Sequence, residues 1–146
     1  LTFVHESTGS ADAEDVADAA SVHLVAGRAA GRALLARRLR PTAVLAANDQ
    51  VAAGLMRSAA EIGLRVPADL SVVGYDDSDA ARLTDPGLTS VRQPGRRLGT
   101  TAAGWLLELI SQGPGQPAGP PRRLPTEVVV RGSTGPAPVF AFPNPD

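Results

Sequence analysis

The stretch that decides the fold is PTAVLAANDQVAAGLMRSAAEIGLRVPADLSVVGYDD, residues 41–77. Residues 43–47 form a continuous apolar run, as a strand covered on both faces does. Residues 51–62 carry apolar side chains at helical spacing, and Gly63 stands where helices commonly end in glycine. Residues 70–75 form a second apolar run of the buried-strand kind. The order strand–helix–strand with short connections predicts a parallel sheet flanked by helices, an α/β fold.

Polar residues follow both predicted strands: Asn48 comes after the first, and Asp76 comes at the end of the second. Parallel strands joined by a right-handed crossover end at the same edge of a sheet, and open α/β sheets bind ligands at that edge. A carboxylate there accepts hydrogen bonds from vicinal hydroxyls or ring N–H groups. We therefore favour a ligand contact for Asp76 over a turn-capping role. For Asn48, ligand contact and helix capping both stay open, and Asp49 is expected to be the better cap.

Outward from this stretch, the patterns predict a helix over 27–39, a short strand over 88–92, an amphipathic helix over 96–112 and a last strand over 126–130. Residues 1–26 have poor periodicity; we expect them to be irregular, with a possible short strand at the start and some helix after residue 12. Residues 135–146 are rich in proline and are expected to be a disordered tail.

Composition excludes several classes of protein. The chain has 146 residues, a hydrophobic fraction of 43%, a net charge of −1 and no cysteine. Disulfide scaffolds, thiolate metal sites and cysteine nucleophiles are thereby excluded, and no basic field would attract nucleic acid. No apolar run reaches the roughly 18 residues of a membrane span. Without a catalytic motif, we expect no enzyme, no catalytic residue, no metal and no cofactor.

Two charged features are predicted to be ordinary surface. The acidic turn at residues 76–79 lacks the glycine and the distal glutamate of a calcium loop, so we interpret it as a solvated turn. The arginines between residues 28 and 40 have no interleaved aromatic residues, so we interpret them as a solvated helix face. Trp105 is expected to pack in a core, because it shares helical spacing with leucines of the 96–112 helix.

Six segments, matching in order and spacing, resemble the effector-binding region of LacI/GalR-type transcriptional regulators: residues 41–50 (PTAVLAANDQ), 63–77 (GLRVPADLSVVGYDD), 88–93 (LTSVRQ), 98–99 (LG), 124–127 (LPTE) and 131–134 (RGST). Each segment alone is modest evidence, but the ordered set is specific. The resemblance covers residues 27–134 and leaves residues 1–26 unmatched.

The resemblance implies a periplasmic-binding-protein-like fold of type I, with two α/β lobes around a cleft. Residues 27–93 and 124–134 would form the C-terminal lobe. The helix within residues 94–113 would belong to an N-terminal lobe that is incomplete in this chain. Because the sheet that this helix packs on is then missing, we expect one of three outcomes: the helix folds back onto the C-terminal lobe, the chain self-associates, or the chain stays partly molten.

The resemblance also implies a function. A sugar or nucleoside-like effector would bind between the lobes of a cytoplasmic repressor and contact Asp76, Asn48 and Gln93. For Gln93, the other interpretation is a solvated hinge residue. The intact protein would be a homodimer that binds operator DNA through a headpiece absent from this chain, with no membrane partner. The alternative is a fragment of a periplasmic sugar-binding protein of an ABC transporter, which shares the fold. A helix-turn-helix upstream favours the repressor, and a signal peptide favours the transporter protein.

Overall fold

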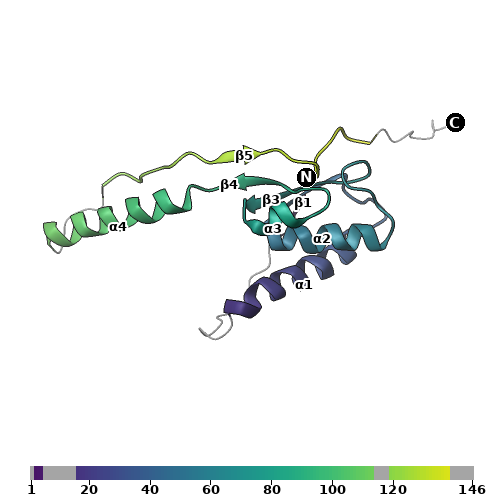
Figure 1. The fold of residues 1–146 in the computed structure, drawn as a ribbon, viewed down its shortest axis with the longest axis horizontal. Coiled ribbons are helices and arrows are strands. Elements are labelled where there is room, and N and C mark those ends of the chain that lie inside the picture. The colour runs from purple at the N-terminus through teal and green to yellow at the C-terminus, as the bar shows by residue number, and fades with distance from the viewer. Residues whose placement is uncertain (1, 5–15, 114–118, 139–146) are drawn as a thin grey trace.

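The computed structural model describes residues 2–4, 16–113 and 119–138. The elements follow in the order β1 (Thr2–Val4), α1 (Val16–Leu35), β2 (Ala43–Ala46), α2 (Asp49–Glu61), β3 (Ser71–Asp76), α3 (Asp79–Leu83), β4 (Thr89–Arg92), α4 (Gly95–Gln112) and β5 (Glu127–Val129). All strands join one sheet in the order β1-β2-β3-β4-β5. Figure 1 shows α2 beside the sheet, α1 along α2, and α4 extending away from both.

The central strand–helix–strand unit is parallel, as the sequence predicts. Ala43 is the register partner of Ser71, and Leu45 is the partner of Val73. The next pairing, β3 with β4, is also parallel, and β5 closes the sheet antiparallel to β4. The α/β fold class is therefore confirmed, and β2, β3 and β4 all end at one edge of the sheet.

The core lies between α2 and the sheet. Its largest fully buried apolar side chains are Leu55, Leu70, Leu88, Val44 and Val72. Two glycines allow the backbones of α1 and α2 to approach closely. A Cβ added at Gly27 would meet the backbone of Val51, and one added at Gly54 would meet the backbone of Leu24. These two helices therefore pack backbone against backbone, with no room for side chains at either glycine.

The N-terminal segment differs from the expectation that residues 1–26 are irregular. Residues 2–4 form β1, which pairs in parallel with β2, and residues 16–26 are the first half of α1. The weak periodicity has a physical cause: α1 contacts α2 through glycine and small residues, which leave little hydrophobic pattern. Residues 5–15 lie outside the described residues. The expected short strand and the helix after residue 12 are confirmed where the structure describes them.

Three other features differ from the sequence-based expectations. α1 ends at Leu35 and not at residue 39, and Leu39 is 82% exposed beyond it. The short helix α3 was not expected. The start of the proline-rich tail is held in place, because Gly135 N–H donates to Ser71 Oγ over 3.1 Å. The expected disorder of residues 139–146 falls outside the described residues.

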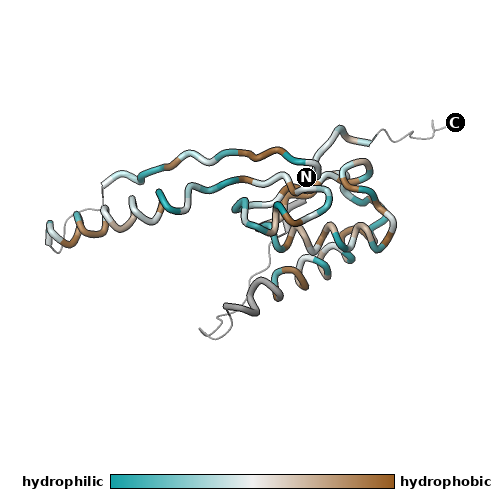
Figure 2. Tube along the Cα trace, in the orientation of Figure 1, coloured by the Kyte–Doolittle hydropathy of each residue, from teal (hydrophilic) through white to brown (hydrophobic). Residues whose placement is uncertain are grey.

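Helix α4 does not fold back onto the sheet. It has no buried residue, and Leu106, Leu107 and Ile110 are 57%, 67% and 66% exposed. Figure 2 shows hydrophobic positions along this projecting helix. Trp105 is half-buried under the guanidinium of Arg122, 5.4 Å from its ring centroid, and is not in a core. Packing of Trp105 in a core is therefore wrong for this chain, because no sheet covers α4. Within the described ranges, no helix is long and apolar enough to cross a bilayer.

Candidate functional site

The candidate site is the edge of the sheet where β2, β3 and β4 end. Asp76 is the register partner of Arg92, so Gln93 follows directly after the level of Asp76. β2 ends at Ala46, so Asn48 follows the carboxyl end of this strand two residues later and caps α2. The topology thus brings all three sequence-predicted site residues, Asp76, Asn48 and Gln93, to one edge. Open α/β sheets bind their ligands at this edge.

Two of these residues contact each other directly. The Gln93 side-chain amide donates a hydrogen bond from Nε2 to Asp76 Oδ1 over 2.7 Å. Asp76 is exposed, and its φ of 101° lies in the region that favours glycine. In the described part of the chain, Asp76 Oδ2 and Gln93 Oε1 accept no hydrogen bond. The pair therefore presents two free acceptor oxygens to solvent.

Asn48 caps helix α2. Its Oδ1 accepts a hydrogen bond from Val51 N–H over 2.9 Å, and its backbone is extended. The expectation that Asp49 is the better cap is wrong, because the Asp49 side chain points to other partners. The capping role of Asn48 occupies only its oxygen, so its amide group stays available as a donor.

Asp49 joins three neighbouring segments beneath this edge. Its carboxylate is fully buried and accepts from Ser90 Oγ over 2.6 Å, from Ser78 N–H over 2.6 Å and from Ser78 Oγ over 2.9 Å. The serine hydroxyl of β4 is held in turn by the N–H of Asp77, which donates to it over 3.1 Å. Gly74 leaves room for this contact, since a Cβ there would meet Asp49 Oδ1. Asp49 is structural, as expected.

Asp77 is a buried carboxylate between arginines. Its side chain is 1% exposed; it accepts from Arg92 Nε over 2.7 Å and from Arg131 Nη2, and Arg82 lies 3.8 Å away. Burial would raise the pKa of Asp77, but the hydrogen bonds from Arg131 and Arg92 outweigh it and hold the pKa below its usual value. Hydrogen bonding to Asp77 raises the pKa of Arg92. The interpretation of residues 76–79 as a solvated turn is therefore wrong for Asp77.

The segment at residues 131–134 fastens the returning chain to the sheet. Ser133 Oγ donates to Val72 O over 2.6 Å and accepts from Thr89 N–H over 2.8 Å. Arg131 Nη1 donates to Leu88 O over 2.7 Å. These contacts explain what Arg131 and Ser133 do in the RGST segment at residues 131–134: they bind this segment to β3 and β4. They were missed because their partners lie more than 40 residues away in sequence.

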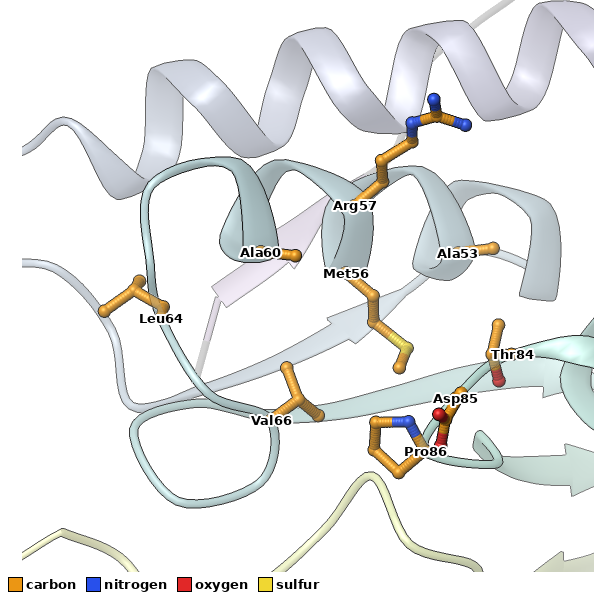
Figure 3. A pocket seen from close by; sticks show the side chains of 9 residues that line it. All are labelled: Ala53, Met56, Arg57, Ala60, Leu64, Val66, Thr84, Asp85 and Pro86. Atoms are coloured by element: carbon orange, nitrogen blue, oxygen red, sulfur yellow. The ribbon is translucent and has the colours of Figure 1, made fainter.

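A cavity of about 240 Å³ opens away from this edge, lined by Ala53, Met56, Arg57, Ala60, Leu64, Val66, Thr84, Asp85 and Pro86. Figure 3 shows Met56 and Val66 directed toward Pro86, with Arg57 pointing away. Its loop residues precede β3 and β4, so it lies toward the amino ends of these strands. None of the sequence-predicted site residues lines it. Among the described residues, no three His, Asp or Glu side chains are grouped to hold a metal ion.

Comparison with known proteins identifies the family. The profile described as the periplasmic binding protein-like domain matches residues 2–134. The chain belongs to this family. This match begins ahead of residue 27, where the resemblance seen in the sequence begins.

The relatives of this periplasmic-binding-protein-like domain are transcriptional regulators. It is 47% identical over 115 residues to the HTH-type transcriptional regulator MalR of Streptomyces coelicolor, covering 79% of this chain and 32% of that protein. It is 47% identical over 94 residues to the lactose operon repressor of Escherichia coli, covering 64% of this chain and 25% of that one. The chain thus spans a third or less of the length of these relatives. The transporter alternative is not favoured.

Solved structures agree with these relatives. A dimeric lac repressor superposes with a TM-score of 0.68 and 40% identity, over 80% of this chain and 41% of that chain. A complex of the transcriptional regulator CelR with cellobiose superposes with a TM-score of 0.66 and 38% identity, over 75% of this chain and 33% of that chain. This chain therefore corresponds to less than half of each of these solved chains.

Proposed function

We propose that this chain is the effector-binding region of a LacI-type transcriptional repressor and that it binds a sugar or nucleoside-like molecule through Asp76, Gln93 and Asn48. The observation that carries the proposal is the Asp76–Gln93 pair, which lies at the carboxyl edge of a parallel sheet with two free acceptor oxygens. The regulator relatives support the same assignment.

The chemistry of this edge favours a ligand rich in hydrogen-bond donors. A carboxylate and an amide oxygen both accept, so hydroxyl groups or ring N–H groups suit them, while phosphates and carboxylates are repelled by Asp76. The amide group of Asn48 adds N–H donors for a ligand oxygen. Sugars and nucleosides carry this mixture of many donors and a few acceptors. The bound cellobiose of CelR is a sugar of this kind.

The remaining steps concern the intact protein. We propose that α4 belongs to a second lobe and that the effector lies between the two lobes and favours one of their relative orientations. Such a shift requires that the effector bind the two orientations with different affinity. The intact protein would be a cytoplasmic homodimer that contacts operator DNA through a separate headpiece and performs no catalysis.

Saturation-transfer NMR tests the proposed ligand class, because it detects weak binding to the chain as it stands. We would screen cellobiose, maltose, lactose, adenosine and guanosine against the chain and against the Asp76→Asn and Asp79→Asn variants. Asp79 is the matched control, since its carboxylate lies in the same turn and is 90% exposed. We expect at least one compound to give a signal that Asp76→Asn abolishes and Asp79→Asn keeps. A signal equally strong in both variants would contradict the role of Asp76.

A further inference from the structure

The chain leaves the sheet toward α4 and returns from α4 at the same place. β4 ends at Arg92 and β5 begins at Glu127, and these two residues are register partners. Their side chains are also paired, with Arg92 Nη1 3.3 Å from Glu127 Oε2. In Figure 1, α4 and the segment returning to β5 project together from this place. The direction of α4 is therefore set by how β4 and β5 leave the sheet.

One carboxylate contacts both the end of β4 that leads to α4 and the segment that follows the far end of β5. Asp77 accepts from Arg92 at the end of β4 and from Arg131 just after β5, through different oxygens. The Arg131 side chain is 19% exposed, and its guanidinium also donates to Leu88 O. Bonds between ionised groups of this kind are short and directional. Asp77 thus ties β3, β4 and the segment after β5 together.

The same carboxylate is the neighbour of the proposed ligand contact. Two side-chain hydrogen bonds connect the end of β3 to the end of β4: Gln93 donates to Asp76, and Arg92 donates to Asp77. Asp76 and Asp77 both have positive φ, 101° and 53°, in a region that few non-glycine residues adopt. The turn therefore depends on its side-chain contacts. Because Asp76 and Asp77 are consecutive residues, a shift of the Asp77 backbone also shifts Asp76.

We infer that Asp77 is a positioning residue that couples the Asp76–Gln93 pair to the direction of α4, by holding the end of β4, from which the chain runs to α4, against β3 and the segment after β5. The coupling to a ligand rests on the proposed function. The positioning itself does not, because every contact that carries it is present without a ligand.

Spin-label distance measurement tests the positioning directly. The chain has no cysteine, so cysteines introduced at Ala60 in α2 and Ala103 in α4, both exposed, are the only thiols. The pair would be measured in the full chain and in Asp77→Asn, each diluted with unlabelled chain so that only distances within one chain are recorded, with Asp79→Asn as the control from the same turn. We expect one narrow distance distribution in the parent and the control, and a broadened or split distribution in Asp77→Asn. The NMR signal of the Gln93 side-chain amide should move toward that of a free glutamine in Asp77→Asn only.

A purely stabilising role gives a different result. Asp77→Asn would then lower the melting temperature but leave the distance distribution and the Gln93 amide signal of the folded chain unchanged, which would overturn the inference. If circular dichroism shows that Asp77→Asn does not fold, Arg92→Gln replaces it, because Arg92 is 45% exposed and its loss disturbs the core less. Arg92→Gln must broaden the distribution for the inference to stand. No ligand is used, so failure to find an effector leaves this test intact.

Discussion

Gln93 donates its side-chain amide to the carboxylate of Asp76 over 2.7 Å, and the two residues come from the ends of neighbouring parallel strands. The Gln93 amide group holds Oδ1 of Asp76 and leaves Oδ2 free. Asp76 also holds a φ of 101°, a conformation that costs about 1–3 kcal/mol and persists where the surroundings impose it. An exposed, strained and oriented carboxylate at the carboxyl edge of a parallel sheet fits the proposed binding role better than a structural one.

Asp49→Ala should strongly destabilise the fold. The substitution leaves the Ser78 N–H, the Ser78 hydroxyl and the Ser90 hydroxyl without their acceptor. Each unsatisfied buried group costs about 1–3 kcal/mol, so we expect a loss of at least about 3 kcal/mol in the free energy of unfolding in urea. Asn48→Ala is the control and should cost about 1 kcal/mol, the usual value of a helix cap. Equal losses for the two variants would contradict the assignment of Asn48 as cap and Asp49 as buried acceptor.

Gly54→Ala should destabilise the chain although alanine is the better helix former. The new Cβ would meet the Leu24 carbonyl and the Arg28 backbone of α1, so we expect a net loss of about 1–3 kcal/mol. Gly99→Ala is the matched control, since nothing lies within 4 Å of its added Cβ in helix α4. That substitution should stabilise α4 by about 0.5–1 kcal/mol. Circular dichroism during thermal unfolding measures both, and a raised melting temperature for Gly54→Ala would refute the close helix contact.

Acid should weaken the fold through Asp77. Its pKa is lower in the folded chain than in the unfolded chain, because hydrogen bonds from Arg131 and Arg92 outweigh the opposite effect of burial. Such a group stabilises the fold fully above its unfolded pKa, about 3.9, and this contribution is lost as the pH falls through the folded pKa. Asp77→Asn should lose about 1.5–3 kcal/mol at neutral pH, the usual contribution of hydrogen bonds to a charged group, because Arg92 and Arg131 lose their shared carboxylate. Urea unfolding of this variant should depend less on pH below about 5 than that of the parent chain. An unchanged acid dependence would argue against the buried pairing.

The chain alone should self-associate through α4. Fold-back, another expectation from sequence, is not observed, and the apolar side chains of this helix stay exposed: Leu98, Leu106, Leu107 and Ile110. Contiguous apolar surface of this kind drives association. We expect light scattering to detect oligomers, and a Leu106→Glu, Ile110→Glu double variant to be closer to a monomer. Arg97→Glu changes charge on the same helix without removing apolar surface and should stay associated. A monodisperse monomer in the parent chain would contradict this prediction.

The parts of the fold that follow a local pattern could be predicted from the sequence. The apolar runs of β2 and β3 and the helical spacing of α2 are sufficient to predict a parallel unit, and the parallel unit brings Asp76 and Asn48 to one edge. The part of α1 before Gly27 is only weakly indicated by the sequence, because the helix packs through Gly27 and other small residues and needs few large apolar side chains.

The supporting contacts of the site could not be predicted, since they join distant segments. Asp77 and Arg131 are 54 residues apart, and no local signal distinguishes Asp77 from an exposed acidic residue. Asn48 and Asp49 are both suitable helix caps by residue type. Which of them faces inward depends on Ser78 and Ser90, which other segments bring to Asp49.

The central claim is that ligands bind at the carboxyl edge of this sheet, and the most direct test is two-dimensional NMR of the labelled chain during titration with the compound that binds in the screen. Two places are compared: the edge residues Asn48, Asp76 and Gln93, and the cavity residues Met56 and Val66 at the other end of β3. We predict progressive shifts of the Asp76 and Gln93 signals, with Met56 and Val66 unchanged. Shifts confined to the cavity residues, with the edge unaffected, would contradict the account.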